Sequence, residues 1–220
     1  SVNPEILQIA TFTTLAALIA TAVMLVPGVA IGWLLARTNF RGKALLETAV
    51  SLPLVMPPVA TGLLLLWLLG RRGPLGFLLE LLGVEVVFTP GAVVIAMVVM
   101  GLPLLVRTAR SGFEQATKRY EQIAETLGAG PWRVFTTITL PLAFRTILAG
   151  ALLGFSRALG EFGATIVIAG SIPGHTRTLA LGIYSFAEMG QNQDAAILLF
   201  ISIAIAFTAV LVSNQLTRDP

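Results

Sequence analysis

Residues 6–36 read ILQIATFTTLAALIATAVMLVPGVAIGWLLA and contain no charged side chain. A helix needs about 20 residues, at about 1.5 Å each, to cross a hydrocarbon core about 30 Å thick. A helix is favoured in that setting because its backbone satisfies its own hydrogen bonds. The stretch is too long for the apolar region of a signal peptide, and no basic residue precedes it, so it predicts a retained membrane-spanning helix.

Three more uncharged stretches have the length of a membrane span, at residues 48–70, 86–106 and 195–217. A fifth apolar stretch, 140–160, carries an arginine near each end, and long arginine side chains can reach the membrane interface. Small residues on this stretch would let a neighbouring helix pack closely, namely Gly150, Gly154, Gly160, Ala149 and Ala151. We interpret it as a span, with a surface helix as the alternative.

The composition is also that of a membrane protein. Hydrophobic residues make up 56% of the chain and charged residues 11%, whereas a soluble domain carries roughly a quarter charged residues. The sequence therefore predicts an all-α integral membrane protein, and no repeat or linker divides it, so residues 1–220 are expected to form one domain. The five predicted spans are residues 8–36, 47–69, 90–108, 140–160 and 195–216.

The distribution of basic residues predicts the orientation. With five spans, ten of the fourteen basic residues fall on one face of the membrane: Arg37, Arg41, Lys43, Arg107, Arg110, Lys118, Arg119, Arg133, Arg145 and Arg218. The positive-inside rule puts that face in the cytoplasm, with the N-terminus outside and the C-terminus inside. This topology explains the net charge of +3 better than nucleic-acid binding does, because no basic stripe with interleaved aromatic residues exists.

Several kinds of chemistry are excluded by residue type. The chain has no cysteine and one histidine, which excludes thiolate catalysis and Cys-based or His-cluster metal sites. The phosphate-binding pattern of ATPases, with its glycine spacing before Gly-Lys-Ser/Thr, is missing. We therefore expect no catalytic residue, no metal ligand and no cofactor in this chain.

Two connections are long enough to carry function. The outer one, 162–194, is too apolar for a free loop and too short for two spans, which favours a half-embedded or re-entrant segment. The inner one, with a loop over about 109–139, has helix-forming residues from 114 to 127 that end at Gly128, Gly130 and Pro131. It could be a helix that docks a partner or merely a solvated connector.

The spacing within the inner loop resembles a family signature. Gln122-Ile123-Ala124, then Gly128, then Ile138, Leu140 and Pro141 match the pattern Glu-Ala-Ala, three residues, Gly, nine residues, Ile, any residue, Leu-Pro. That pattern belongs to the permease subunits of bacterial ABC importers. Gln122 and Ile123 depart from it, although Glu121 supplies an acid one residue earlier.

Further stretches resemble the molybdate branch of these permeases over nearly the whole chain. They are FRGK at 40–43, LPL at 52–54 with PP at 57–58, GRRG at 70–73, TLGAG at 126–130, WRVF at 132–135, LGEFGAT at 159–165 and IPG at 172–174. Some relatives carry an additional helix before the first span. The first predicted span of this chain begins at residue 8, so we expect no such helix here.

The resemblance implies a type I importer fold in a bacterial or archaeal cytoplasmic membrane, with molybdate as cargo and tungstate or sulfate as alternatives. It implies two copies of the permease in the bilayer, two ATP-binding subunits that hold ATP and magnesium, and an external molybdate-binding protein, with no nucleic acid. The inner loop would form a coupling helix seated on the ATPase. Its candidate residues are Glu121, Gln122, Ile123, Ala124, Glu125, Leu127, Gly128, Ala129 and Pro131.

Candidate pathway or gate residues lie in the second and fourth spans: Pro53, Pro57, Pro58, Ser156, Arg157, Glu161, Phe162 and Gly163. The prolines predict a kink toward the pathway or a hinge, with a packing kink as the alternative. Arg157 and Glu161 lie one helical turn apart, so we predict an ion pair in preference to direct substrate contact. The resemblance puts Glu161 at the end of a pathway-lining helix.

The remaining polar candidates are weaker. The hydroxyls of Ser156, Thr165, Ser171 and Thr176 could contact an oxyanion, but ordinary helix or turn hydrogen bonds account for each more simply. His175 titrates nearest to neutral pH, although nothing else favours a pH-sensing role. A stand-alone secondary transporter would need an intramembrane relay of acids, and Glu161 is the single acid well inside a predicted span.

Overall fold

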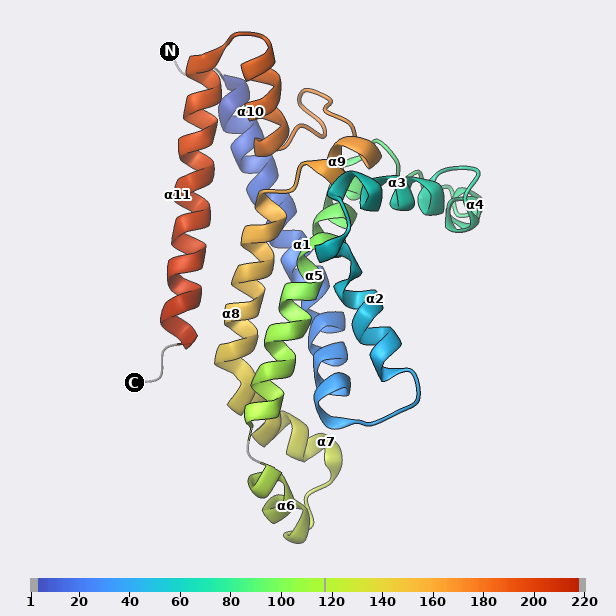
Figure 1. Cartoon of the computed structure of the whole chain (residues 1–220), viewed down its shortest axis with the longest axis vertical. Helices are drawn as coiled ribbons and strands as arrows, with labels where there is room; N and C mark the ends of the chain where they lie inside the picture. Colours follow the sequence, from blue (N-terminus) through green and yellow to red (C-terminus); the bar gives the residue numbers. More distant parts are fainter. Residues whose placement is uncertain (1–3, 117, 218–220) are drawn as a thin grey trace.

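The computed structural model describes residues 4–116 and 118–217, and within these ranges the regular elements are all helical. Four long helices run along the length of the molecule (Figure 1): α1 (Pro4–Arg37), α5 (Pro90–Gln115), α8 (Leu140–Leu159) and α11 (Asn192–Thr217). The helix α5 packs against both α1 and α8, and α11 packs on α8. Arg218, one of the basic residues assigned to the cytoplasm, lies outside the described residues.

Small residues bring the long helices close together, as the sequence predicts. A Cβ added to Gly150 of α8 would lie 2.8 Å from Cβ of Thr108 on α5, and one added to Gly154 would lie 2.7 Å from Cε of Met24 on α1. The third glycine of the pattern, Gly160, is an exception, because its nearest neighbour would be its own helix's Ser156 carbonyl at 3.9 Å. The prediction of close packing is therefore confirmed for two of the three glycines.

The kink that the prolines predict in the second span, 47–69, is present in the structure. The structure divides it into α2 (Lys43–Val55) and α3 (Pro58–Leu69), which meet at an angle of 117°. Met56 and Pro57 are extended, because a residue before proline avoids helical geometry, and Pro58 starts α3, where no amide hydrogen is needed. Pro53 stays inside α2. Four described helices are long and apolar enough to span a membrane, or five if the bent pair is one span.

The cytoplasmic boundaries also shift from those predicted. The helix α5 continues to Gln115, and α8 is preceded without interruption by α7 (Pro131–Val134) and a π-helical turn, η1 (Phe135–Thr139). The helix expected over residues 114–127 is divided at Ala116, whose backbone is extended, so its second part is a separate helix, α6 (Lys118–Thr126). The polar connection is thus shorter than the sequence suggests.

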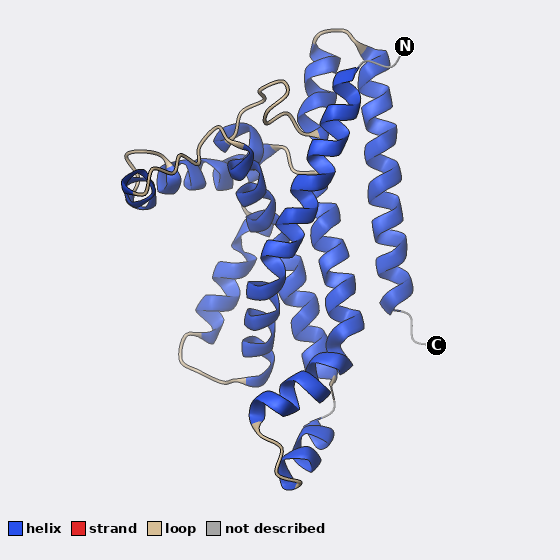
Figure 2. Ribbon diagram, turned by 180° about the vertical axis from the view of Figure 1, so that it is seen from behind, coloured by secondary structure: helices blue, strands red, loops and turns tan. Residues whose placement is uncertain are grey.

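The two ends of the helix bundle differ in structure. One end holds α6 and α7, while the opposite end holds the first residues of α1 together with α3, α4 (Pro74–Leu81), α9 (Gly163–Ile168) and α10 (Leu179–Glu188) (Figure 1). The view from behind shows the long loops between α4 and α5 and between α9 and α10 at this second end (Figure 2). Because α6 and α7 lie in the basic connection, the positive-inside rule assigns their end to the cytoplasm.

Candidate coupling and translocation sites

The cytoplasmic helix α6 is attached to the bundle through Glu121. Its Oε1 accepts a hydrogen bond from Arg37 Nη2 at 2.6 Å and another from Thr139 Oγ1 at 2.7 Å. Arg37 Nη2 also lies 3.1 Å from the carbonyl oxygen of Ala116, to which it donates. The Arg37 and Glu121 side chains are only 9% and 18% exposed. Glu121 therefore points into the protein and joins α6 to the end of α1 and the start of α8.

The opposite side of the same segment is apolar and exposed. Ile123 is 47% exposed, Leu127 82% and Trp132 76%. Gln122 and Glu125 are also exposed, whereas Ala124 and Ala129 are half-buried. Exposed large apolar side chains on an otherwise polar surface are typical of sites that contact a protein or a membrane.

Gly128 reverses the chain after α6. The amide of Gly128 donates to the carbonyl of Glu125 at 2.9 Å, and the amide of Ala129 donates to the carbonyl of Ala124 at 3.0 Å. This pair of bonds is the Schellman motif, which needs a left-handed residue, and Gly128 has φ +85°. Pro131 then begins α7 at its first position. The predicted helix stop is confirmed, and Pro131 also starts the next helix.

An aromatic cluster supports α7 from behind. The ring of Phe135 stacks on Trp132 with centroids 5.9 Å apart and meets the edge of Trp33 at 5.8 Å. These residues line an apolar groove of about 700 Å³ between α1 and α7. These contacts pack the coupling segment, residues 118–134, against the cytoplasmic end of α1.

At the outer end of α8, Glu161 is 1% exposed and both of its oxygens are engaged. Oε2 pairs with Arg157 Nη1 at 2.8 Å, and Oε1 accepts from the Ala164 amide at 2.6 Å. The predicted ion pair is confirmed, and the bond to Ala164 was missed. A carboxylate before the first turn of α9 satisfies an amide that the helix leaves open. Arg157 remains 27% exposed.

The helix α9 packs directly on the α3 segment that follows the proline break. A Cβ on Gly163 would lie 2.7 Å from Cβ of Pro58, and one on Gly62 would lie 2.8 Å from both Cα and O of Ala164. The structure thus brings together Pro58, Gly163 and, through Ala164, Glu161. Pro53 lies apart from them, inside α2, and Phe162 packs edge-on to the ring of Tyr184 at 5.3 Å.

Most of the candidate hydroxyls have structural partners. Ser156 Oγ donates to the Leu152 carbonyl, Thr176 Oγ1 donates to the Ala169 carbonyl, and Ser171 Oγ accepts weakly from Arg177 Nε. Thr165 is the exception, because its buried hydroxyl has no protein partner. A second such hydroxyl, Thr61 on α3, was not among the candidates, because nothing in the sequence distinguishes it from the other threonines of apolar helices.

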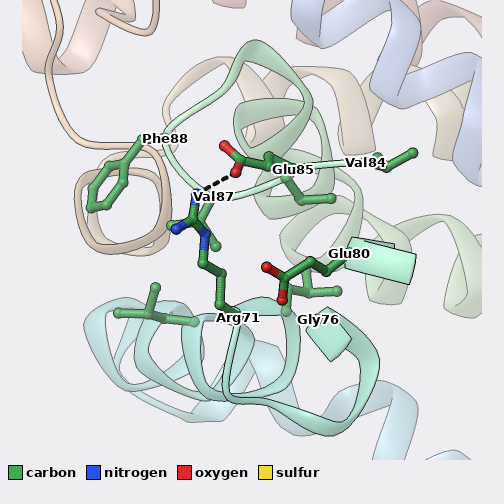
Figure 3. A pocket seen from close by; sticks show the side chains of 11 residues that line it. Arg71, Gly76, Glu80, Val84, Glu85, Val87 and Phe88 are labelled. Carbon is green, nitrogen blue, oxygen red and sulfur yellow. Dashed lines mark hydrogen bonds and ion pairs between the residues drawn. The ribbon is translucent and has the colours of Figure 1, made fainter. Parts of the chain in front are cut away.

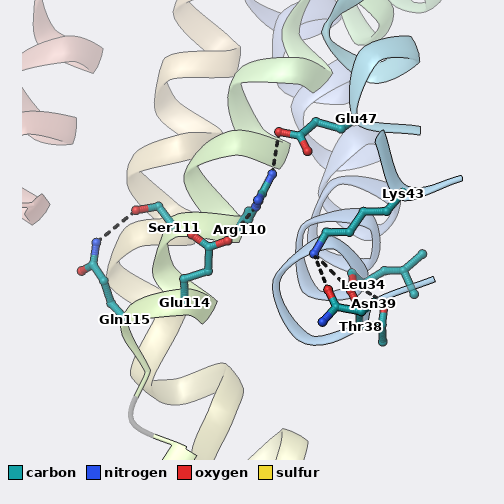
Figure 4. Close-up of polar contacts among 9 residues, drawn as sticks. All are labelled: Leu34, Thr38, Asn39, Lys43, Glu47, Arg110, Ser111, Glu114 and Gln115. Carbon is teal, nitrogen blue, oxygen red and sulfur yellow. Dashed lines mark hydrogen bonds and ion pairs between the residues drawn. The ribbon is translucent and has the colours of Figure 1, made fainter. Parts of the chain in front are cut away.

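Three further ion pairs were also missed, and two of them join different parts of the chain, 63 and 14 residues apart. Arg110 on α5 lies between Glu114 of its own helix and Glu47 of α2, at 2.7 Å from each (Figure 4). At the outer end, Arg71 points to Glu85 across a cavity of about 380 Å³ (Figure 3). The Glu85 carboxylate raises the pKa of Arg71 above its ordinary value.

The described residues contain no group of three His, Cys, Asp or Glu side chains that could hold a metal ion. They combine exposed apolar side chains on α6 and α7 at one end, a close contact of α3 with α9 at the other, and long apolar helices between.

Comparisons with known proteins agree with this arrangement. The binding-protein-dependent transport system inner membrane component family matches residues 28–217. The chain is 47% identical over 193 residues to the molybdenum transport system permease protein ModB of Escherichia coli K12, covering 87% of this chain and 84% of ModB. It is 33% identical over 216 residues to the probable sulfate transport system permease protein cysT of Marchantia polymorpha, covering 98% and 75% of the two chains.

Among solved structures, the chain is similar to one in the inward-facing MetNI methionine ABC transporter, with a TM-score of 0.70, 15% identity and 97% of each chain covered. The predicted ABC importer permease fold is thereby confirmed. By its sequence, its helices and this fold, the chain belongs to the binding-protein-dependent transport system inner membrane component family and is a multi-pass protein of the inner membrane.

Proposed function

We propose that this chain is the membrane subunit through which an ATP-driven importer carries molybdate into the cytoplasm. The observation that carries the proposal is the 47% identity to ModB over 87% of the chain. The proposed assembly contains two copies of this chain, two ATP-binding subunits with ATP and magnesium, and an external protein that delivers the anion.

The exposed face of the coupling segment is the proposed seat of the ATP-binding subunit. Ile123, Leu127 and Trp132 would fill an apolar groove of the partner, since burying each such side chain contributes about 1.5–3 kcal/mol. Gly128 would set the direction in which the chain leaves that groove. Glu121 has a different role from the one expected, because it would hold α6 in place from the inside and not contact the partner.

The contact of α3 with α9 is the proposed gate. Oxyanions passing a conduit must bind weakly enough to leave, so a site lined by few charges suits transport. The Arg157 side chain is 27% exposed and Glu161 neutralises its charge, and this would allow a passing dianion to make a brief contact without binding tightly. Pro57 and Pro58 would act as the joint about which α3 moves relative to α2.

Sulfate is the second candidate cargo, because the similarity to a probable sulfate permease covers 98% of this chain. Tungstate has the same charge and shape class as molybdate and is expected to share the pathway. A stand-alone secondary transporter is not supported, since Glu161 has both oxygens engaged and so lacks the free carboxylate that an ion relay needs.

The test is uptake by proteoliposomes that contain this chain with the ATPase and binding protein encoded beside it. We expect ATP-dependent accumulation of labelled molybdate, blocked by excess tungstate and weakly affected by excess sulfate. Accumulation of sulfate that excess molybdate does not reduce would show that sulfate, and not molybdate, is the cargo. Uptake by this chain alone, driven by an ion gradient without ATP, would refute the importer function.

A further inference from the structure

The long helix α1 is attached by charged side chains at both of its ends. At the cytoplasmic end, Arg37 is its last residue and pairs with Glu121 of α6 at 2.6 Å, with the Arg37 side chain 9% exposed. Thr139, at the start of α8, donates to the same carboxylate oxygen. Any displacement of α6 must therefore move Arg37 or break a buried ion pair.

At the outer end, α1 holds the connection between α9 and α10. Glu5 Oε1 pairs with Arg177 Nη1 at 2.7 Å, and the Arg177 side chain is again 9% exposed. One turn further along α1, the side-chain nitrogen Nε2 of Gln8 lies 3.4 Å from the carbonyl oxygen of Gly174. The buried Thr13 hydroxyl accepts from the Leu179 amide, at the start of α10, at 2.9 Å.

The outer loop held in this way presents an exposed tip. Thr176 is buried and braces the loop from within, because it accepts from the Ile172 amide and donates to the Ala169 carbonyl. Ile172, Pro173, Gly174 and His175 remain exposed at the surface. This tip lies at the end of the molecule away from α6 (Figure 1), so the loop and the coupling segment share no direct contact.

The helix between these attachments is continuous. It runs from Pro4 to Arg37, 34 residues, which at about 1.5 Å per residue spans about 50 Å. Pro27 lies inside it without ending it. A continuous helix transmits displacement along its axis more directly than a chain of loops, and coupling between distant sites requires an element that both sites can bias.

We propose that α1 is the mechanical link between the coupling segment and the outer loop, with Arg37 and Arg177 as its positioning residues. The inference rests on the proposed importer function, in which an ATPase seats on one end and a delivering protein on the other. Buried ion pairs contribute little net stability but define geometry, and this suits them to fix the two ends of a link.

The experiment uses the complete complex in nanodiscs and measures ATP hydrolysis with and without the anion-loaded binding protein. Arg37→Gln and Arg177→Gln are each expected to leave basal hydrolysis in place and to reduce the stimulation by binding protein about fivefold or more. The double variant R37E/E121R is expected to recover stimulation, because it restores the pair with reversed charges.

The matched control is Arg71→Gln, which breaks an outer-end ion pair that is exposed and not attached to α1. It is expected to keep normal stimulation. Normal stimulation in Arg37→Gln and Arg177→Gln would overturn the inference, as would a double variant that assembles with its ATPase but remains unstimulated. Absence of stimulation in the unmodified complex would instead count against the proposed function, so the two failures are distinguishable.

Discussion

Replacing Gly62 with alanine tests the contact between α3 and α9 that forms the proposed gate. The new Cβ would lie 2.8 Å from both Cα and O of Ala164. Neither atom can rotate away, because both belong to the backbone of α9. That helix is itself held by the bond from the Ala164 amide to Glu161 and by the bond from the Phe88 amide to the Ile168 carbonyl at 3.0 Å.

Two opposing terms set the magnitude. Alanine is favoured over glycine inside a helix by about 0.5–1 kcal/mol. Forcing an extra carbon into a tight contact costs about 1–3 kcal/mol. The net destabilisation is therefore about 0.5–2 kcal/mol, which corresponds to a fall of about 1–8 °C in melting temperature for a chain of this size.

The assay is thermal unfolding of the purified complex in one detergent, together with ATP-dependent uptake. Gly160→Ala is the matched control, since the added carbon meets nothing closer than 3.9 Å and the backbone there has φ −87°. We expect the control to melt at or slightly above the unmodified temperature and Gly62→Ala to melt below it and transport more slowly. If Gly62→Ala matched the control in both readouts, α3 and α9 would not be in the contact described.

Three other changes have defined outcomes. Glu161→Ala removes both contacts of a buried carboxylate and should cost about 2–3 kcal/mol, whereas Glu161→Gln keeps an acceptor and should cost about half as much, measured by detergent unfolding. Gly128→Ala forces a residue with a side chain to φ +85° at a cost of about 1–2 kcal/mol and should weaken ATPase binding, while Gly130→Ala, with open space around it, should bind normally. The hydrogen bond to Glu188 raises the pKa of Tyr184, so ultraviolet titration should show its phenol ionising at a higher pH than a free tyrosine. The stabilising effect of this bond is present below the ordinary pKa and is lost as pH rises through the raised pKa. Glu188→Gln should return the pKa of Tyr184 to its ordinary value.

The spans were predictable because the membrane imposes one rule on every helix that crosses it. Long uncharged stretches identified α1, α5 and α11, and the apolar stretch with one arginine near each end identified α8. A kink at the prolines of the second span was predictable as well, but its size was not. Residues 48–69 carry no charge, yet the pair Pro57-Pro58 divides the span into α2 and α3, which meet at an angle of 117°. Hydropathy indicates whether a segment can lie in the membrane, whereas proline restricts the backbone geometry of that segment.

The end of α6 was predictable, because its glycine stop is a local feature. Gly128 has the left-handed backbone that its position in the pattern requires. The role of Glu121 was not predictable, because its partner Arg37 lies 84 residues away and only the folded chain brings the two together. The same limit applies to the pair formed by Arg110 and Glu47, which are 63 residues apart.

The distribution of these long-range pairs carries a physical argument about movement. The apolar helices meet through van der Waals contacts, which have little directionality. The charged pairs, in contrast, are directional and short, and they join α1 to α6, α1 to the outer loop, and α2 to α5. A protein that changes shape while keeping such pairs must move the joined elements together. Among the described residues, the charged pairs therefore join α1 to other elements at both of its ends and join α2 to α5, and none of them crosses the break at Pro57 and Pro58.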